Sequence, residues 1–377
     1  MNFLLSEELV QFRDVLRALL AKELAGAELR RGLLDPYSGQ CVGGESPAPL
    51  VAPLWRKIAD AGVLAAALPD SVGGRAIGGL GLGAIALQVM LEEAGRALVP
   101  LPVFETLVFG ALPLLAVDAA ADSCDLLASI AAGEMQVSGA FFRSIGDLPE
   151  ARSVADSILI DGDLQFVSSL PQCASVLVPA RYEGACALFI IDSAACVTTT
   201  VPTLDLLRRF SRVSFHSTSA KRVGGVLQDG ASAALHCRQQ LACVAELVGV
   251  GQRVLEMTVE YVKTRQQFGR PIGSFQAIQH KLADMSLHVE QATSLGRFAA
   301  WAADNDPAQL SSAALAAKGF ASEVIPVVVE QAIQAHGGIG FTYEYDLHLY
   351  LRRARLLAAL GTPTDEAYAQ LGAQLLA

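Results

Sequence analysis

The segment TRQQFGRPIGSFQAIQHKLADM, residues 264–285, joins two long stretches of helical periodicity. Arg265 ends the first stretch, Pro271 turns the chain, and Gln276 lies at the start of the second. The guanidinium of Arg265 can bind a diphosphate through paired hydrogen bonds, while Phe268 offers a flat face and Gln276 an amide. Taken alone, the segment equally fits a plain helix end, in which Arg265 satisfies carbonyl groups and Phe268 packs in the core.

A second glycine-rich segment, QAHGGIGFTYEY, covers residues 334–345. Its glycines Gly337, Gly338 and Gly340 allow the backbone to approach a ligand closely and expose amide donors. A simple glycine stop of the preceding helix fits the same residues. The segment is no dinucleotide-binding fingerprint of the strand–turn–helix type, because it follows a helical pattern.

Outward from these segments, the last 150 residues predict a helical bundle. Asp306 and Pro307 suit the cap and first position of one of its helices. The expected helices cover residues 232–265, 275–303, 307–336, 345–360 and 363–376. Long helices of this kind are well suited to packing against other copies or related chains.

The rest of the chain divides into a helical part and a β part. Ser6 suits the cap of a first helix, and helical spacing returns at 54–64 and 84–96, on either side of a glycine-rich turn. From about residue 136 the pattern changes to period two, which predicts a small antiparallel sheet or barrel. The predicted domains are 1–135 (helical), 136–227 (β) and 228–377 (helical bundle).

Bulk composition excludes several classes of function. A formal charge of −10 argues against nucleic-acid and anionic-membrane surfaces, since phosphate binding needs dense basic patches. Hydrophobic residues make up 52% of the chain and charged residues only 18%, so apolar faces are expected to meet partner subunits. The seven cysteines lack the spacing of a zinc site or disulfide framework, and no signal peptide or membrane span is indicated. Cytoplasmic residence is the expectation.

Together, in this order and about 70 residues apart, the two segments closely resemble the acyl-CoA dehydrogenase family. The likeness includes a P-x-x-x-G-G turn at Pro69, Gly73 and Gly74, and the run Glu92 to Arg96. It implies a mainly α fold with a central β domain: an N-terminal helical domain, a small β-barrel-like domain and a C-terminal helical bundle.

The resemblance also implies an FAD site shared between subunits. In the family, these two motifs reach across an interface to an FAD that is held mainly by a neighbouring chain. Matched residue by residue, the cofactor-binding candidates are Arg265, Gln267, Phe268, Ile272, Gln276, Gln334, Gly337 and Gly338.

The chain departs from the family at the catalytic base. Dehydrogenation requires a carboxylate to remove the α-proton of the thioester, while the β-hydrogen leaves as hydride to the flavin. Most members place this glutamate where Leu360 stands here, and a minority place it at the position of Gln239, 26 residues before Arg265. Neither side chain accepts a proton. Glu246 lies two turns further along the helix, about 10 Å along its axis, which is too far for a simple replacement.

The flavin-ring pocket departs as well. The family's Thr-Glu-Pro loop with Gly-Ser-Asp is replaced by residues 139–153, and its Trp-Ile-Thr by Phe166-Val167-Ser168. No catalytic residue is therefore assigned to this chain, and no metal site is expected.

These losses resemble the smaller, base-less subunit of heteromeric α2β2 acyl-CoA dehydrogenases of bacterial steroid side-chain degradation. The resemblance implies a catalytic partner subunit, a steroid side-chain CoA ester as substrate and an electron-transfer flavoprotein as acceptor. Three alternatives stay open at this point: a flavin-dependent monooxygenase or oxidase on the same fold, a non-catalytic acyl-CoA-binding scaffold, and a homotetramer that uses Glu246 as its base. The run Arg352, Arg353 and Arg355 is expected on a solvated helix face or in interface ion pairs.

Overall fold

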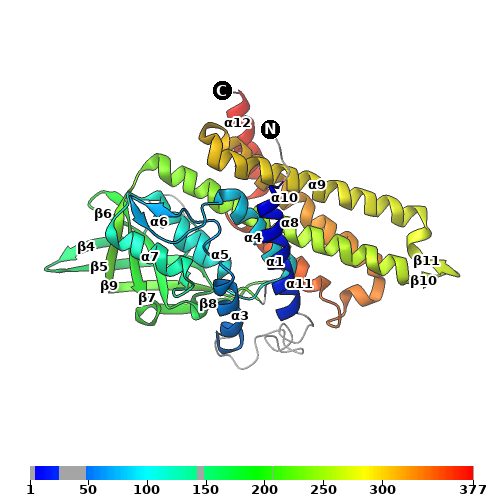
Figure 1. The fold of residues 1–377 in the computed structure, drawn as a ribbon, viewed down its shortest axis with the longest axis horizontal. Coiled ribbons are helices and arrows are strands. Elements are labelled where there is room, and N and C mark those ends of the chain that lie inside the picture. Colours follow the sequence, from blue (N-terminus) through cyan, green and yellow to red (C-terminus); the bar gives the residue numbers. More distant parts are fainter. Residues whose placement is uncertain (1–4, 25–47, 142–147, 206, 377) are drawn as a thin grey trace.

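A computed structural model describes residues 5–24, 48–141, 148–205 and 207–376. Helices from both ends of the chain pack beside a central β domain, as Figure 1 shows. This is the mainly α architecture with a central β domain that the sequence predicts. The domain limits after residues 135 and 227 stay predictions.

The N-terminal part begins with the predicted capped helix. The Ser6 hydroxyl accepts a hydrogen bond from the Leu9 amide at 3.3 Å, which satisfies an end donor of α1. Gly73 and Gly74, with φ of 57° and 80°, form the two-residue turn of the β1–β2 hairpin. The elements are α1 (Glu7–Glu23), α3 (Ala48–Asp60), β1 (Ser71–Val72), β2 (Arg75–Ala76), α4 (Gly83–Ala97), α5 (Val103–Glu105), η1 (Thr106–Ala111), α6 (Leu112–Ala116) and α7 (Ala121–Ala131).

The β domain is a closed barrel. Its strands pair in the order β6–β4–β5–β9–β7, and β7 pairs in turn with β6, which closes the sheet. The predicted small, mainly antiparallel barrel is confirmed, with two short parallel pairings in addition, of β3 and β4 with β6. Register shifts along β9 let this strand bend and pair with β5, β7 and β8. The strands are β3 (Val137–Ser138), β4 (Glu150–Val154), β5 (Ser157–Ser168), β6 (Ser175–Tyr182), β7 (Ala185–Asp192), β8 (Val197–Val201) and β9 (Phe210–Leu227).

The C-terminal bundle matches its predicted helices closely. α10 starts at Pro307 as predicted, although the Asp306 side chain caps no amide there. The segment 307–341 is long and apolar enough to cross a membrane. However, 72% of its apolar 18-residue stretch is buried within the protein, as in a bundle core. The elements are α8 (Asp229–Thr264), β10 (Gln266–Gln267), β11 (Arg270–Pro271), η5 (Ile272–Ser274), α9 (Gln276–Asn305), α10 (Pro307–His336), η6 (Gly337–Phe341), α11 (Leu347–Ala359) and α12 (Thr364–Leu376).

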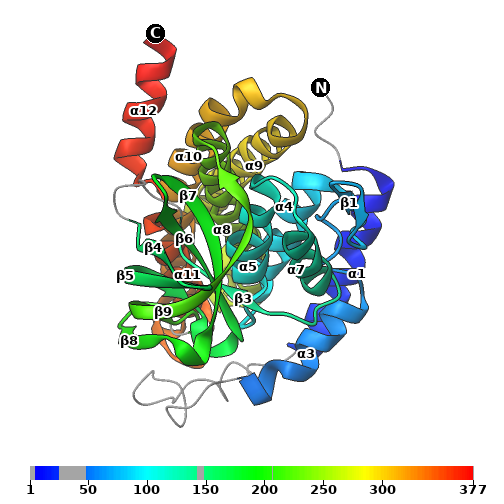
Figure 2. The ribbon, with the colours of Figure 1, turned by 90° about the vertical axis from the view of Figure 1, so that its left-hand side faces the viewer.

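Helix α8 sets the distance between the two ends of the molecule. It has 36 residues, so at 1.5 Å per residue it spans about 54 Å. Its first residue follows the barrel strand β9, and its last precedes the β10–β11 hairpin. The barrel therefore lies at one end of α8 and the hairpin at the other, as Figure 1 shows; Figure 2 views the molecule from the barrel end.

Two glycines allow α4 and α8 to cross at close range. A Cβ atom on Gly249 would lie 1.9 Å from the Glu92 carbonyl oxygen, and one on Gly95 would lie 2.3 Å from that of Glu246. Only glycine fits such a backbone contact without displacing a helix. This explains the glycine in the run Glu92 to Arg96, which joins the N-terminal helices to the bundle.

We expect Gly249→Ala to destabilise the protein by roughly 1–3 kcal/mol or more, because the methyl group forces the two helices apart. The matched control is Gly372→Ala in α12, where a Cβ atom meets no neighbour within 4 Å and should be neutral or stabilising. Thermal and urea unfolding of both variants measures the difference, and equal stabilities would contradict the close-crossing interpretation.

Candidate functional site

The two glycine-containing segments meet at one end of the bundle. The Tyr261 hydroxyl, on the last turn of α8, donates to the His336 carbonyl oxygen at 3.2 Å. The two rings stack with centroids 4.3 Å apart, and Tyr345 lies 4.9 Å from the His336 ring. Burial lowers the pKa of His336, which favours its neutral form. Stacked rings thus fix the glycine turn next to the hairpin.

The β10–β11 hairpin presents its candidate residues to solvent. Phe268 has a positive φ of 53° and is 92% exposed, so the alternative that packs it in the core is wrong. Phe275 contacts its ring edge-on, with centroids 6.1 Å apart, and the Arg270 guanidinium covers Phe275 at 4.2 Å. The Ile272 amide donates to the Arg265 carbonyl at 2.8 Å, which closes the turn. The hairpin is therefore ordered by its own contacts and its outer face remains accessible.

The proposed cofactor contacts share this exposed end of the bundle. Gly337 has a φ of 65°, a conformation that glycine adopts readily, and it turns the chain just after α10. All of the candidates except the half-buried Ile272 are exposed: Arg265, Gln267, Phe268, Gln276, Gln334, Gly337 and Gly338.

The positions of the family base lie at the opposite end of α8, near the barrel. Gln239 is only 1% exposed, and its amide nitrogen lies 3.4 Å from the Val108 carbonyl oxygen. Leu360 is half-buried and packs against the hydrophobic core. The cavity beside Gln239 measures only about 10 Å³ and has Phe109 and Leu235 among its lining residues. This space is too small for an acyl group.

The turn after Leu360 is packed against both the barrel side and α8. A Cβ atom on Gly361 would lie 3.4 Å from Gln240 and 3.6 Å from Phe141. The Thr362 hydroxyl accepts a hydrogen bond from the Gln240 amide at 3.0 Å, and a ring nitrogen of His236 lies 3.1 Å away. These contacts fix the turn that follows Leu360, and the assignment of Leu360 to the position of the family base stays a prediction.

Lys318 is a residue of this region that the sequence interpretation missed. Its ammonium donates to the Leu357 and Ala358 carbonyls at 2.8 and 3.0 Å and to the Ser322 hydroxyl at 3.0 Å. Burial lowers the pKa of Lys318 to about 8, although three oxygen acceptors favour the charged form. It holds the C-terminal end of α11 just before Leu360. The only sequence signal is a lone cation within the apolar run of residues 307–336.

Glu246 is bound in a buried ion cluster. Arg208 donates to both of its carboxylate oxygens at 2.9 Å, and Arg353 approaches it at 3.7 Å. Glu105 pairs with Arg208 at 3.1 Å and Asp205 with Arg353, and all five side chains are buried. Burial acts to lower the pKa of Arg208, but the charges of Glu246 and Glu105 outweigh it and raise that pKa. Arg208 engages both carboxylate oxygens of the buried Glu246, so the group is not free to contact a substrate, which argues against Glu246 as base.

The same cluster corrects the expectation for the arginine run on α11. Arg353 is 1% exposed and lies in the core, whereas Arg355 forms an exposed ion pair with Glu330. The Phe166-Val167-Ser168 segment also contributes, because the Ser168 hydroxyl donates to Glu105. Of residues 139–153, positions 142–147 lie outside the described residues, so the replacement of the family loop there stays a prediction.

We expect Arg208→Met to destabilise the protein by about 3–5 kcal/mol, because it leaves Glu105 and Glu246 buried without their shared cation. Arg212→Met is the matched control, since Arg212 and Asp163 form an ion pair at the surface worth about 1 kcal/mol or less. Chemical denaturation measures both variants. A loss for Arg208→Met no greater than for Arg212→Met would contradict the structural role of the cluster.

Comparison with known proteins shows which family the chain belongs to. Residues 233–375 match the family model described as the C-terminal domain of acyl-CoA dehydrogenase. The acyl-CoA dehydrogenase IpdE2 of Mycobacterium tuberculosis is 33% identical over 356 residues, which cover 94% of this chain and 93% of the relative. IpdE2 of Mycolicibacterium smegmatis is 30% identical over 373 residues, covering 98% and 100%.

Solved structures agree with the sequence matches. The ChsE4–ChsE5 complex from Mycobacterium tuberculosis superposes with a TM-score of 0.84 at 26% identity, covering 100% of this chain and 99% of the matched one. A variant of the Tcur3481–Tcur3483 steroid acyl-CoA dehydrogenase gives 0.82 at 28% identity, with 98% of both chains covered. Fold, full-length similarity and the matched family model confirm the resemblance, and the chain belongs to the acyl-CoA dehydrogenase family.

Proposed function

We propose that this chain is the base-less subunit of a heteromeric, FAD-dependent acyl-CoA dehydrogenase. In this assembly a second family member supplies the catalytic carboxylate and the flavin-ring pocket. The present chain completes the partner's FAD site with the hairpin and glycine turn at the far end of α8. The complex introduces an α,β double bond into an acyl-CoA thioester.

The observation that carries this proposal is a contrast along α8: the predicted base positions near the barrel are filled and buried, whereas the predicted cofactor contacts at the hairpin end are exposed. Toward the barrel end, Gln239 and Leu360 occupy the predicted base positions, and the cavity beside Gln239 measures about 10 Å³. At the hairpin end, Arg265, Phe268 and Gly337 are exposed. About 39 Å of helix separates Gln239 from Arg265, so a cofactor at the hairpin end belongs with the barrel of another chain.

The residues at the hairpin end fit the diphosphate and adenine side of FAD. Arg265 supplies a fork of donors for a diphosphate, Phe268 a flat apolar face, and Gly337 a turn in which the backbone is open to a ligand. When bound, FAD supplies a hydride acceptor for the β-hydrogen of the substrate. The α-proton goes to the partner's carboxylate, since Leu360 and Gln239 accept none.

The names of the similar proteins support the finer assignment of substrate and partner. The Tcur3481–Tcur3483 protein, 28% identical to this chain, is named a steroid acyl-CoA dehydrogenase. It and ChsE4–ChsE5 each carry the names of two different chains. We therefore assign a steroid side-chain CoA ester as substrate and an α2β2 heterotetramer as the assembly. The electron pair passes to an electron-transfer flavoprotein.

The first test is co-expression with a family member that retains the base glutamate. We expect a yellow α2β2 complex with two FAD, which anaerobic addition of a steroid side-chain CoA ester bleaches. Replacing the partner's glutamate with glutamine should abolish bleaching, and Leu360→Glu in this chain should not restore it, because the pocket beside Gln239 is closed. A yellow homotetramer of this chain alone that is bleached by an acyl-CoA would refute the proposal.

The second test addresses the cross-subunit contact. We expect Arg265→Ala to weaken FAD binding by the complex by about 10- to 100-fold, because a charged hydrogen-bond donor to a diphosphate is lost. Arg152→Ala, which removes an exposed arginine of the barrel, serves as the matched control. FAD content after dialysis and the dissociation constant from flavin fluorescence report the effect. Equal FAD retention in both variants, in an intact heterotetramer, would exclude the assigned role of Arg265.

A further inference from the structure

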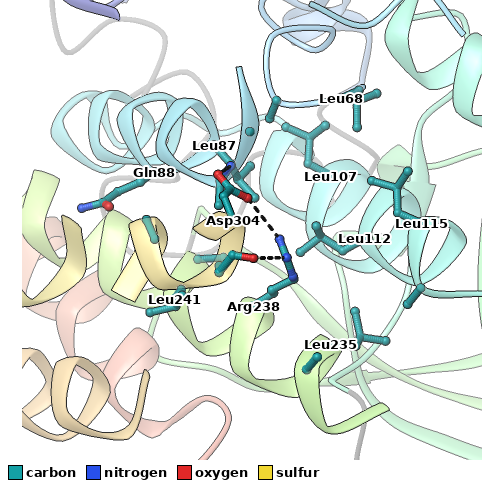
Figure 3. Close-up of a pocket in the computed structure, with 18 of the residues that line it drawn as sticks. Leu68, Leu87, Gln88, Leu107, Leu112, Leu115, Leu235, Arg238, Leu241 and Asp304 are labelled. Atoms are coloured by element: carbon teal, nitrogen blue, oxygen red, sulfur yellow. Dashed lines mark hydrogen bonds and ion pairs between the residues drawn. The ribbon is translucent and has the colours of Figure 1, made fainter. Parts of the chain in front are cut away.

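A second, much larger cavity lies away from both ends described above. It measures about 520 Å³, and it is lined by the loops before α4 and by α4, η1, α6, α8 and α9. Figure 3 shows leucine side chains of its wall, among them Leu68, Leu107, Leu112, Leu115 and Leu235. The volume falls in the range of small-molecule sites, which are mainly apolar with a few placed polar groups.

The polar side chains that line this cavity are Gln88 and the ion pair of Arg238 and Asp304, which has an open geometry. Arg238 and Asp304 both line it, and their closest charged atoms, Nη1 and Oδ1, are 3.8 Å apart. This is longer than a direct hydrogen bond, so one further oxygen atom can bridge the two groups. Figure 3 shows the pair facing each other beside the leucine wall.

The surrounding structure fixes both members of the pair. The second terminal nitrogen of Arg238, Nη2, donates to the Ala303 carbonyl at 2.5 Å. The Ala84 amide donates to Asp304 Oδ2 at 2.7 Å. A Cβ atom on Gly83 would lie 2.4 Å from Asp304 Oδ2, so glycine at this position leaves room for the carboxylate. Contacts from α4, α8 and α9 together thus fix the 3.8 Å distance between Arg238 Nη1 and Asp304 Oδ1.

We propose that this cavity binds a neutral lipophilic alcohol. Its hydrocarbon body replaces empty space against the leucines, and its hydroxyl group donates to Asp304 Oδ1 and accepts from Arg238 Nη1. A hydroxyl can serve both members of the pair because it is at once donor and acceptor. A carboxylate would face Asp304 with a like charge, and a plain hydrocarbon would leave the pair unbridged.

The site is distinct from the base positions and from the hairpin. Leu235 lines both this cavity and the small one beside Gln239, so its side chain is the wall between them. Arg238 and Gln239 are neighbours on α8 and point about 100° apart around the helix axis. The inference does not depend on the proposed role in FAD binding, because every residue of the cavity belongs to this chain.

The experiment titrates the purified full chain, and the co-expressed complex, with 1-decanol and with decanoate by isothermal titration calorimetry. We expect 1-decanol to bind at one site per chain, at least tenfold more tightly than decanoate. Leu112→Trp should weaken 1-decanol binding at least tenfold by filling the cavity from a half-buried position. Leu287→Trp, at a 55% exposed position on α9, is the matched control.

A second variant tests the polar end. Arg238→Leu should weaken 1-decanol binding by about 2- to 10-fold, the effect of one hydrogen bond, and should leave decanoate at least as strongly disfavoured, because Asp304 then faces a carboxylate without its cation. Absence of 1-decanol binding to the folded wild-type chain overturns the proposal, as does equal affinity for decanoate or equal binding by Leu112→Trp. Binding to the isolated chain but not to the complex overturns it too, because a partner segment then fills the cavity.

Discussion

The buried ion cluster around Arg208 is the constraint on which the arrangement of the three parts depends. Glu105 comes from the N-terminal helices, Asp205 and Arg208 from the segment that enters β9, and Glu246 from α8. Removing such charges from water is costly, and only their mutual contacts offset that cost. The cluster therefore specifies one relative placement of barrel and bundle, since any displacement would leave a charge buried without its partner.

This placement determines what the barrel end of α8 can do. Arg353 fixes α11 to the cluster, and Lys318 binds the carbonyl groups at the end of the same helix. The next residues, Leu360 to Thr362, are consequently held between α8 and Phe141. In the proposed function, Leu360 stands in this turn at the place of the family's catalytic carboxylate, and leucine has no acid–base chemistry.

Local signals in the sequence predicted most helices but not the interactions between distant segments. Helix α10 was predicted at both ends because Pro307 and Gly337 mark its limits chemically. Strand β4, with the sequence EARSV, lacks the period-two apolarity that would mark a strand, and the length of β9 depends on its pairing with β7 and β8. The burial of Arg353 was mispredicted, because spacing on one helix cannot show that Asp205 and Glu246 lie opposite. The large cavity likewise depends on how separate helices pack.

The exposed hairpin end also has a consequence for the cell that makes this protein. Phe268 is 92% exposed and Phe341 73% exposed, on segments that the ring stack around His336 brings to one end of the bundle. Under the proposed function, a copy synthesised without its partner would keep these aromatic rings in water, where they would promote self-association and recognition by chaperones and proteases. Production of the two chains in equal amounts, from neighbouring and jointly regulated coding sequences, would keep the orphan pool small. A cofactor site shared between two chains would thus require that the cell synthesise both chains in equal amounts.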